Sequence, residues 1–467
     1  MRVLLIWPQN ANSVLSDELS CCEPLPLEYL AGALKSRHDV VIHDLRLDPP
    51  LATLADGPQP HLVGLALPYT TMLRSAHQVA REIRDLWPQV PLVIGGHHPT
   101  MSTEWLMGLP ADYAVVGEGG PALAELCDQI ERHGQMVAPI VGVGRFEDLW
   151  KGITRPSFHS LEEIPRPDRT LLRHHHQHYF HSIYRPVALM RFSAGCPYKC
   201  TFCSLWRLTD RHYLTQTIPA IIEELQEIAV ENIYVVDDEA FIQPQRMLLL
   251  ADAIEQAGIK KRFHMYLRTD TTVRRSDVVA RWREVGLDSV LVGAESLQDD
   301  DLDEYDKGAK VDQTKKAVAI FHDLNIKVRA NFIVKPNYSR ENFRRLAQEV
   351  AHLGIDMPSF SVLCPLPGTQ LYEETHQTFI SDNPDLFDCY HTLLETRLPL
   401  HRFYEEMAQL LAVTSARKTP GINSENDPSV FYYSHSGAFQ RMLDTVRQGH
   451  HWNAERWQMP AAAALKN

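Results

Sequence analysis

Two series of alternating strand and helix patterns run along most of this 467-residue chain. In residues 1–145 the apolar runs stand at 2–7, 40–44, 62–67, 92–94 and 113–116, with helical spacing between them, as at 71–87 and 121–133. Alternation of this kind is typical of a parallel sheet covered by helices on both faces. We therefore predict an α/β protein with a doubly wound, flavodoxin-like domain at residues 1–145.

The second series predicts a barrel at residues 187–375. Its strand-like runs stand at 187–190, 233–236, 263–267, 289–292, 328–334 and 360–363, and its helical patterns include 218–228, 245–257 and 340–353. Six β/α units favour a partial (β/α)6 barrel over a closed eightfold one. The stretch 146–186, rich in Pro, Arg and His, is predicted to be a linker, and residues 376–467 a small, mostly helical cap on the barrel mouth.

Length and composition narrow the class of protein. A chain of 467 residues is longer than one hydrophobic core usually supports, so two or three domains are expected. The net charge of −13 argues against a nucleic-acid partner held through phosphate contacts. Residues 1–8 are too short an apolar run for a signal peptide, and no run is long enough for a transmembrane segment. Only eight cysteines occur, which favours a cytoplasmic protein.

Three cysteines gather just after the strand predicted at 187–190. Cys196, Cys200 and Cys203 form a C-x3-C-x2-C pattern, which places three thiolates on one loop. A structural zinc site normally takes four ligands in paired spacings, and no second pair follows. A [4Fe-4S] cluster held by three cysteines instead leaves one iron open to a ligand. Zinc or a redox-active cysteine pair is the alternative. Cys364 is expected to be a buried structural thiol.

The cysteine pattern, with Phe202 just before its last member, resembles the signature of the radical S-adenosylmethionine (SAM) superfamily. The resemblance implies that the open iron binds the amino and carboxylate groups of SAM. It also implies that one electron, supplied by an external reductant of the flavodoxin or ferredoxin type, splits SAM to give a 5′-deoxyadenosyl radical.

Charged residues follow the strands of the second series and suit a zwitterionic ligand such as SAM. SAM needs hydrogen-bond acceptors for its ammonium and ribose groups and a cation for its carboxylate. The resemblance assigns the amino group to Asp237, Asp238 and Glu239, and the carboxylate or ribose to Arg268 and Glu295. Phe202 is expected beside SAM, and Lys307 is a weaker candidate.

Small and polar residues also follow the strands of the first series, where doubly wound sheets bind ligands. They are Pro8, Tyr69, Thr70, Thr71, Gly95, Gly96, His97, His98, Gly117, Glu118 and Gly119. The glycines are expected to let the backbone come close to a bulky ligand. The order of these loops resembles the cobalamin-binding domain that precedes many radical SAM domains. The alternative is a flavodoxin-like domain that binds nothing or a different nucleotide.

The cobalamin predicted here has no assignable imidazole ligand, because the Asp-x-His-x-x-Gly pattern of the cobalamin mutases is missing. The resemblance therefore implies a base-off cofactor whose lower face meets a non-ligating side chain from Tyr69–Thr71. His97 and His98 are expected to hydrogen-bond the cofactor. The run His174–His178 is predicted to be a solvated or cofactor-packing part of the linker, because no carboxylate stands at ligand spacing.

Taken over nearly its whole length, the chain resembles the cobalamin-dependent radical SAM enzymes of the methyltransferase class. Residues 330–336, 366–369 and 394–404 are most similar to the hopanoid C-3 methylase group. The resemblance implies that methylcobalamin methylates an unactivated carbon of a small or lipid-like substrate after the radical removes hydrogen, and Tyr390 and His391 are expected to face that substrate. Two alternatives stay open: a non-methylating reaction (ring contraction, cyclisation or oxidation), and a non-catalytic cobalamin or electron-transfer module.

Overall fold

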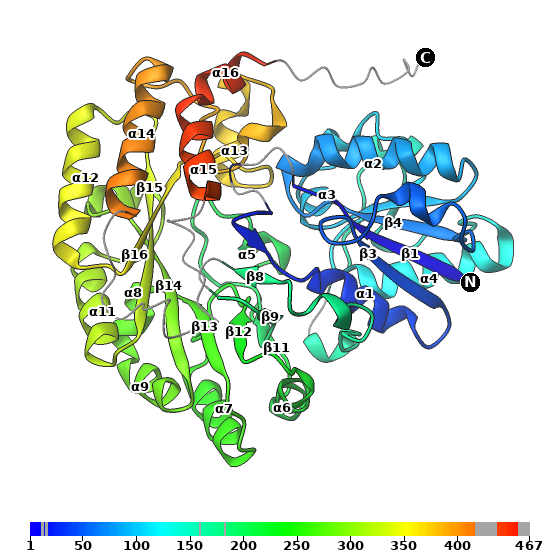
Figure 1. Ribbon diagram of the computed structural model, residues 1–467, viewed down its shortest axis with the longest axis horizontal. Helices are drawn as coiled ribbons and strands as arrows, with labels where there is room; N and C mark the ends of the chain where they lie inside the picture. The colour runs from blue at the N-terminus through cyan, green and yellow to red at the C-terminus, as the bar shows by residue number, and fades with distance from the viewer. Residues whose placement is uncertain (11–13, 15–16, 158–159, 182–183, 416–436, 456–467) are drawn as a thin grey trace.

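The computed structural model describes residues 1–10, 14, 17–157, 160–181, 184–415 and 437–455. Two α/β bodies lie side by side, the N-terminal one in blue and cyan and the second in green and yellow (Figure 1). The C-terminal helices, in orange and red, adjoin the second body. Among the described residues, no helix combines the length and the apolar character needed to cross a bilayer.

The N-terminal sheet has six strands in the order β3-β1-β4-β5-β6-β7. Their bounds are β1 Arg2–Trp7, β3 Asp39–Asp44, β4 Leu62–Ala66, β5 Leu92–Gly95, β6 Tyr113–Val115 and β7 Val143–Arg145. The first five are parallel, as predicted, and β7 adds an antiparallel edge that no periodic pattern indicated. The strand order makes the sheet flavodoxin-like.

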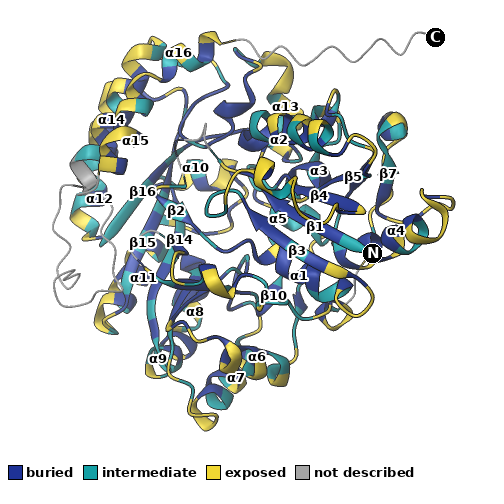
Figure 2. Ribbon diagram, turned by 45° about the vertical axis from the view of Figure 1, so that its right-hand side comes forward, coloured by how far each residue is buried: buried dark blue, intermediate teal, exposed yellow. Residues whose placement is uncertain are grey.

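Helices cover both faces of this sheet because successive side chains of a strand point to opposite sides. Val3 and Leu5 pack with α1 (Leu25–Leu34) and α4 (Gly119–His133), whereas Leu4 and Ile6 pack with α2 (Leu73–Leu86). The strands are buried and the outer helix faces are exposed (Figure 2). The predicted doubly wound domain is thus confirmed.

The second sheet also has six strands, in the order β16-β15-β14-β13-β12-β9, and all of them are parallel. Their bounds are β9 Val187–Met190, β12 Asn232–Val235, β13 Arg262–Leu267, β14 Leu287–Glu295, β15 Lys327–Val334 and β16 Met357–Val362. Strands that are consecutive in sequence are neighbours in the sheet, and β9 and β16 form its two edges. The sheet is the predicted partial barrel.

The barrel helices pack on the outer face of this sheet around one large core that includes the fully buried Trp282. They are α6 Ile218–Glu227, α7 Pro244–Gln256, α8 Thr269–Arg274, α9 Ser276–Glu284, α10 Asp299–Glu304, α11 Val311–Asp323 and α12 Arg340–Leu353. Most inward residues of the longer helices are apolar and most outward residues polar, which is why helical spacing could be read from the sequence. The short α8 instead buries Thr269, Asp270, Thr271 and Thr272.

The C-terminal helices only partly take the position that we predicted. They are α13 Gln370–Thr375, α14 Leu400–Ser415, α15 Gly437–Arg447 and α16 Gly449–Ala454. The longest, α14, packs against α12 and the edge strand β16, so that Phe403 and Met407 join the barrel core. An edge strand presents unpaired backbone groups that proteins usually cover. The prediction that the cap helices lie on the barrel mouth is therefore wrong for α14.

The linker is held to both bodies. Its strand β8 (Phe180–His181) pairs antiparallel with β2 (Ser20–Cys21), which precedes α1. Arg169, also in the linker, forms ion pairs with Glu23 at 2.8 Å, Glu28 at 3.5 Å and Glu224 of α6 at 2.6 Å. All three carboxylates are buried, and burial raises the pKa of Glu28 well above its usual value. One guanidinium thus joins the N-terminal domain, the linker and the barrel.

Candidate active site

The three cysteines lie on a loop closed at its base by two short strands, β10 (Ser193–Ala194) and β11 (Leu214–Thr215), which pair antiparallel. Gly195 precedes Cys196 with a φ of +88°, and a Cβ there would lie 2.0 Å from the His212 carbonyl oxygen. Only glycine fits this position without displacing the backbone. The Gly195 N–H donates to Asp238 at 2.8 Å, which ties the cysteine loop to the end of β12.

The thiols lie in surroundings that suit a buried metal cluster. Cys200 is buried, and its carbonyl oxygen accepts from the Cys203 N–H at 3.1 Å and from the Trp206 indole at 3.3 Å. Burial raises the pKa of Cys196 to about 11 and that of Cys203 to about 12. Thiols of this kind become thiolates when a metal binds. Three soft donors on one loop fit a [4Fe-4S] cluster.

Asp237 holds the strand that leads into the cysteine loop. One carboxylate oxygen accepts from the backbone N–H groups of Phe192 at 2.7 Å and Ser193 at 2.9 Å, and the other accepts from the Ser193 hydroxyl. Burial raises the pKa of Asp237 to about 6, and these hydrogen bonds oppose the rise. The observed partners give this residue a positioning role, while its predicted contact with SAM stays a prediction.

Glu239 offers a buried acceptor that the protein leaves unused. Its side chain is at the carboxyl end of β12, and its Oε1 accepts weakly from the Phe241 N–H at 3.4 Å. Its Oε2 is buried without a hydrogen-bond partner. Burial raises the pKa of Glu239 to about 7, although the nearby Arg268 lowers it. An orphaned buried carboxylate oxygen fits a cationic ligand group such as the ammonium of SAM.

Arg268 and Glu295 occupy the next two strand ends, and Lys307, in the loop after α10, lies beside them. The Arg268 guanidinium lies 3.6 Å from the Tyr198 ring centroid, donates to Asp270 at 2.9 Å and also donates to the Lys307 carbonyl. Lys307 pairs with Glu295 at 2.8 Å, and both side chains are more than nine-tenths buried. Glu295 has a φ of +59° where β14 breaks register with β15. These charged groups therefore lie beside the cysteine loop.

Phe202 packs against apolar neighbours. Its ring makes an edge contact with Tyr305 at 5.5 Å between centroids, and it borders a small apolar cluster that includes Ile333 and Leu363. This packing anchors the cysteine loop to the ends of β15 and β16. Its predicted contact with SAM stays a prediction.

Two loops of the N-terminal sheet touch the cysteine segment. His97 Nε2 lies 3.1 Å from the Ser204 hydroxyl, directly after Cys203, and Glu118 pairs with Arg191 at 3.3 Å, shortly before Cys196. Burial lowers the pKa of His97 to about 4, so its ring is neutral at pH 7. The carboxyl ends of both sheets thus border one shared space.

The remaining residues that we predicted to bind cobalamin lie along the carboxyl edge of the N-terminal sheet. Pro8 follows β1 and is buried, and the buried Thr70 and Thr71 lie in a short turn before α2. The Thr70 hydroxyl is hydrogen-bonded to His98 Nδ1 at 2.9 Å, while His98 Nε2 is buried without a partner. Burial lowers the pKa of His98 to about 3. A neutral imidazole with one free nitrogen fits a hydrogen-bonding ligand at this edge.

Tyr69 projects from this edge toward the barrel. Tyr69 is 59 % exposed, and Cys22 and Tyr266 of β13 lie near its hydroxyl. The exposed Tyr69 ring has neighbours from both the N-terminal domain and the barrel, and it faces the space between these two domains. A large planar cofactor would cover such a ring.

The structure gives a different reason for two of the predicted glycines. A Cβ at Gly96, where φ is +132°, would lie 2.7 Å from the Leu67 carbonyl oxygen, and one at Gly117, where φ is +77°, would lie 2.9 Å from Pro156. At these two positions the protein's own atoms already require glycine, and the predicted place of these glycines beside a ligand stays a prediction. Gly95 and Gly119 meet only ordinary or slightly tight contacts.

The two predicted substrate residues lie inside the cap. His391 is fully buried, with its Nδ1 2.9 Å from Asp388 and its ring stacked on Trp452 at 4.8 Å. Tyr390 is 8 % exposed. Their predicted contact with substrate stays a prediction, and the observed partners place His391 in the packing of the cap.

Sequence reasoning missed Arg191, Tyr198 and Ser204. Arg191 directly follows β9, packs its guanidinium 4.4 Å from the Tyr29 ring centroid and has two buried nitrogens, Nε and Nη2, without partners. The sequence feature that could have indicated Arg191 is its position shortly before the cysteine loop. Tyr198 and Ser204 carry no pattern of their own, because their partners come from other strands and from the other domain.

Comparison with known proteins agrees with this architecture. Residues 14–127 match the B12 binding domain and residues 190–350 match the radical SAM superfamily. The hopanoid C-3 methylase of Methylococcus capsulatus is 29% identical over 83% of this chain and 75% of its own length. An anaerobic magnesium-protoporphyrin IX monomethyl ester cyclase of Rubrivivax gelatinosus is 24% identical over 83% of this chain and 71% of its own.

Among solved structures, the radical SAM methyltransferase TsrM of Kitasatospora setae, with cobalamin and a [4Fe-4S] cluster bound, superimposes with a TM-score of 0.68. The match covers 97% of this chain and 98% of TsrM at 17% identity, so it shows a shared fold. The chain therefore carries a B12 binding domain followed by a radical SAM domain, the two domains that cobalamin-dependent radical SAM enzymes combine. The two matched domains give its cofactors as cobalamin, SAM and a [4Fe-4S] cluster.

Proposed function

We propose that this enzyme transfers a methyl group to an unactivated carbon of a small or lipid-like molecule held between the two sheets. The observation that carries the proposal is the pair of contacts across the domains, His97 with Ser204 and Glu118 with Arg191. They bring the cobalamin-type loops against the cysteine loop. When bound, cobalamin supplies the methyl group, and SAM on the cluster supplies the radical that activates the substrate carbon.

The residues of the barrel then have distinct tasks. Cys196, Cys200 and Cys203 hold the cluster, and Asp237 and Asp238 fix the segment that carries them. Glu239 takes the ammonium of SAM through its free oxygen. The charged side chains of Arg268, Glu295 and Lys307 bind the carboxylate and ribose of SAM. Phe202 supports the cysteine loop by packing against Tyr305.

The N-terminal loops hold cobalamin, and we propose the division into domains at 1–145, 187–375 and 376–467 on the same basis. Tyr69, Thr70 and Thr71 face the lower side of a base-off cofactor, because Tyr69 is the open aromatic side chain of that edge. His97 and His98 are neutral and donate or accept hydrogen bonds without a charge. The loops at Pro8, Gly95–Gly96 and Gly117–Gly119 complete the proposed cobalamin site at the carboxyl edge of the N-terminal sheet.

The substrate binds where the carboxyl ends of the two sheets meet. The barrel also holds a cavity of about 20 Å³, lined by residues that include Tyr184, Tyr234, His264 and Met357. That space suits about one water molecule and is too small for a substrate. Tyr390 and His391 contribute from the cap only if that region opens during binding.

An external one-electron carrier of the flavodoxin or ferredoxin type reduces the cluster. Exposed cations surround the cysteine loop although the chain is acidic overall: Arg155, Lys199, Arg211 and Arg274. Arg211 donates to the Pro197 carbonyl at 3.2 Å, and Arg274 donates to the Tyr198 hydroxyl at 3.2 Å. Positive charge there favours approach of an acidic protein.

Anaerobic turnover tests the proposal. The reconstituted enzyme with cobalamin, SAM and a low-potential reductant is assayed across candidate substrates, and 5′-deoxyadenosine and S-adenosylhomocysteine are measured together. Both compounds formed in step with a product heavier by one methyl group support the proposal. Deoxyadenosine without S-adenosylhomocysteine favours a non-methylating reaction, for which the cyclase relative is the precedent. Formation of neither compound by cluster-loaded protein contradicts both.

A further inference from the structure

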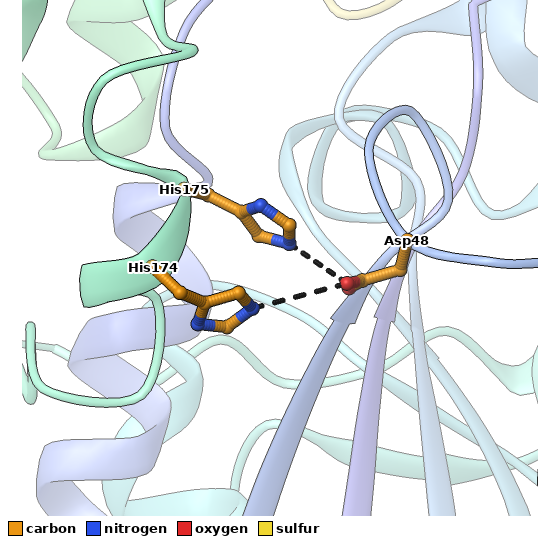
Figure 3. Close-up of side chains that lie close together, drawn as sticks. All are labelled: Asp48, His174 and His175. Carbon is orange, nitrogen blue, oxygen red and sulfur yellow. Dashed lines mark hydrogen bonds and ion pairs between the residues drawn. The ribbon is translucent and has the colours of Figure 1, made fainter.

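The histidine run of the linker meets a carboxylate from the N-terminal domain. His174 and His175 lie in the 3-10 turn η6 (Arg173–His175), and Asp48 follows β3. His175 Nε2 lies 2.7 Å from Asp48 Oδ1, and His174 Nε2 lies 3.9 Å from the same oxygen. Figure 3 shows both imidazole rings turned toward this carboxylate. The three ligand atoms lie within 4.8 Å of one another.

Asp48 is oriented by its own neighbours. Its second oxygen accepts the backbone N–H of Asp44 at 2.7 Å and lies 3.7 Å from His43 Nδ1. His43 is itself fixed by a hydrogen bond of 2.9 Å between its Nε2 and the Pro49 carbonyl. With Oδ2 held in this way, Oδ1 is left for the two linker histidines. Supporting contacts of this kind are what orient a carboxylate toward a metal ion.

The spacing of the three donors suits a tetrahedral ion. Two ligand atoms that each lie about 2.0–2.1 Å from a tetrahedral zinc ion are about 3.3 Å apart. The two observed nitrogen–oxygen distances, 2.7 and 3.9 Å, lie on either side of that value. His174 is 61 % exposed and adjusts freely, whereas His175 and Asp48 are largely enclosed.

We propose that Asp48, His174 and His175 form a Zn²⁺ site, with water as the fourth ligand. Two imidazoles and one carboxylate are a ligand set that zinc accepts. We assign the ion a structural role rather than a part in the methyl transfer. It fastens the linker to the end of β3, in the region where Asp44 already binds Arg46 and Tyr179.

Zinc binding is measured on the untagged holoenzyme, with its cluster and cobalamin in place, because a histidine tag or empty cluster cysteines would also bind zinc. The protein is equilibrated anaerobically with Zn²⁺, freed of excess metal and analysed for zinc per chain. X-ray absorption at the zinc edge then separates nitrogen and oxygen ligands at about 2.0–2.1 Å from sulfur at about 2.3 Å. The variants are His174→Gln, His175→Gln and Asp48→Asn, and the control is His178→Gln.

The wild-type protein and His178→Gln are expected to retain one zinc ion with nitrogen and oxygen ligands, and the three site variants to bind it at least tenfold more weakly. Because His174 is exposed, His174→Gln keeps the test informative if a buried variant fails to fold. Absence of retained zinc in the wild type overturns the proposal. The contact between His175 and Asp48 would then be a hydrogen bond without a metal ion. Equal loss in His178→Gln, or a sulfur-bound ion, overturns it as well.

Discussion

His97 and Ser204 are hydrogen-bonded at 3.1 Å although they lie 107 residues apart and belong to different domains. His97 follows the Gly95–Gly96 turn of the N-terminal sheet, and Ser204 follows the last cysteine of the cluster loop. This contact fixes the separation between the loops proposed to hold cobalamin and the cluster. Radical transfer depends on that separation, because reacting atoms must be close and aligned.

His97→Ala and Ser204→Ala are expected to slow product formation, while the cluster and bound cobalamin remain. Since the two side chains act through one contact, the double variant is expected to be no slower than the slower single variant. Turnover numbers under anaerobic conditions, with iron and cobalamin content as controls, give the comparison. Additive losses would mean that the two residues act independently.

Cys203→Ala is expected to abolish the [4Fe-4S] cluster and all formation of 5′-deoxyadenosine, because two thiolates cannot hold a cluster that needs three. Cobalamin binding is expected to persist, since its loops belong to the other domain. The matched control is Cys364→Ala, which removes a buried thiol outside the loop. Iron analysis and the visible spectrum provide the readout, and cluster loss in Cys364→Ala would contradict this assignment.

SAM affinity is expected to depend on pH through Glu239. Burial raises its pKa to about 7, so the carboxyl group is protonated below that pH and ionised above it. An ionised Glu239 attracts the ammonium of SAM, and the dissociation constant is therefore expected to rise as the pH falls through about 7. Glu239→Gln is expected to bind SAM about 10–100-fold more weakly at pH 8 and to lose this pH dependence.

Equilibrium binding of SAM to the cluster-loaded protein between pH 6 and 8.5 measures this effect. Asp277→Asn, an exposed carboxylate paired with Arg275, serves as the control. A pH profile that persists in Glu239→Gln would assign the titration to another group.

Gly195→Ala is expected to reduce cluster content strongly, because the added methyl group would lie 2.0 Å from the His212 carbonyl oxygen. Gly258→Ala is the matched control: it also has a positive φ, of +64°, but open space around the missing Cβ. The control is expected to lose only roughly 1–2 kcal/mol of folding stability, which is the cost of placing alanine in the left-handed backbone conformation. Iron per chain and melting temperature distinguish the two variants, and equal behaviour would show that backbone strain alone matters.

Arg169→Met is expected to destabilise the folded protein by about 3–5 kcal/mol, because it leaves three buried carboxylates without their cation. Arg166→Met is the comparison, since Arg166 pairs with the exposed Glu223 and Glu227 and is expected to contribute no more than about 1 kcal/mol. Denaturant unfolding of both variants tests this difference. A small effect at Arg169 would indicate that the glutamates accept protons when the cation is removed.

Local patterns in the sequence determined both sheets and the cysteine loop. The strands of each sheet were readable because a buried parallel strand is a short apolar run, and the helices because one face is apolar at a 3.6-residue period. The spacing of Cys196, Cys200 and Cys203 was sufficient to predict a cluster site because all three proposed ligands lie within eight residues.

Only the tertiary structure decided which distant groups meet. It placed α14 on the edge strand β16, engaged both oxygens of Asp237 within the protein, and brought Asp48 to a histidine 127 residues away. Periodicity reports which face of an element is buried but not which element covers it. Ion pairs and hydrogen bonds between domains leave no periodic trace in either partner, so they become visible only when the chain is folded.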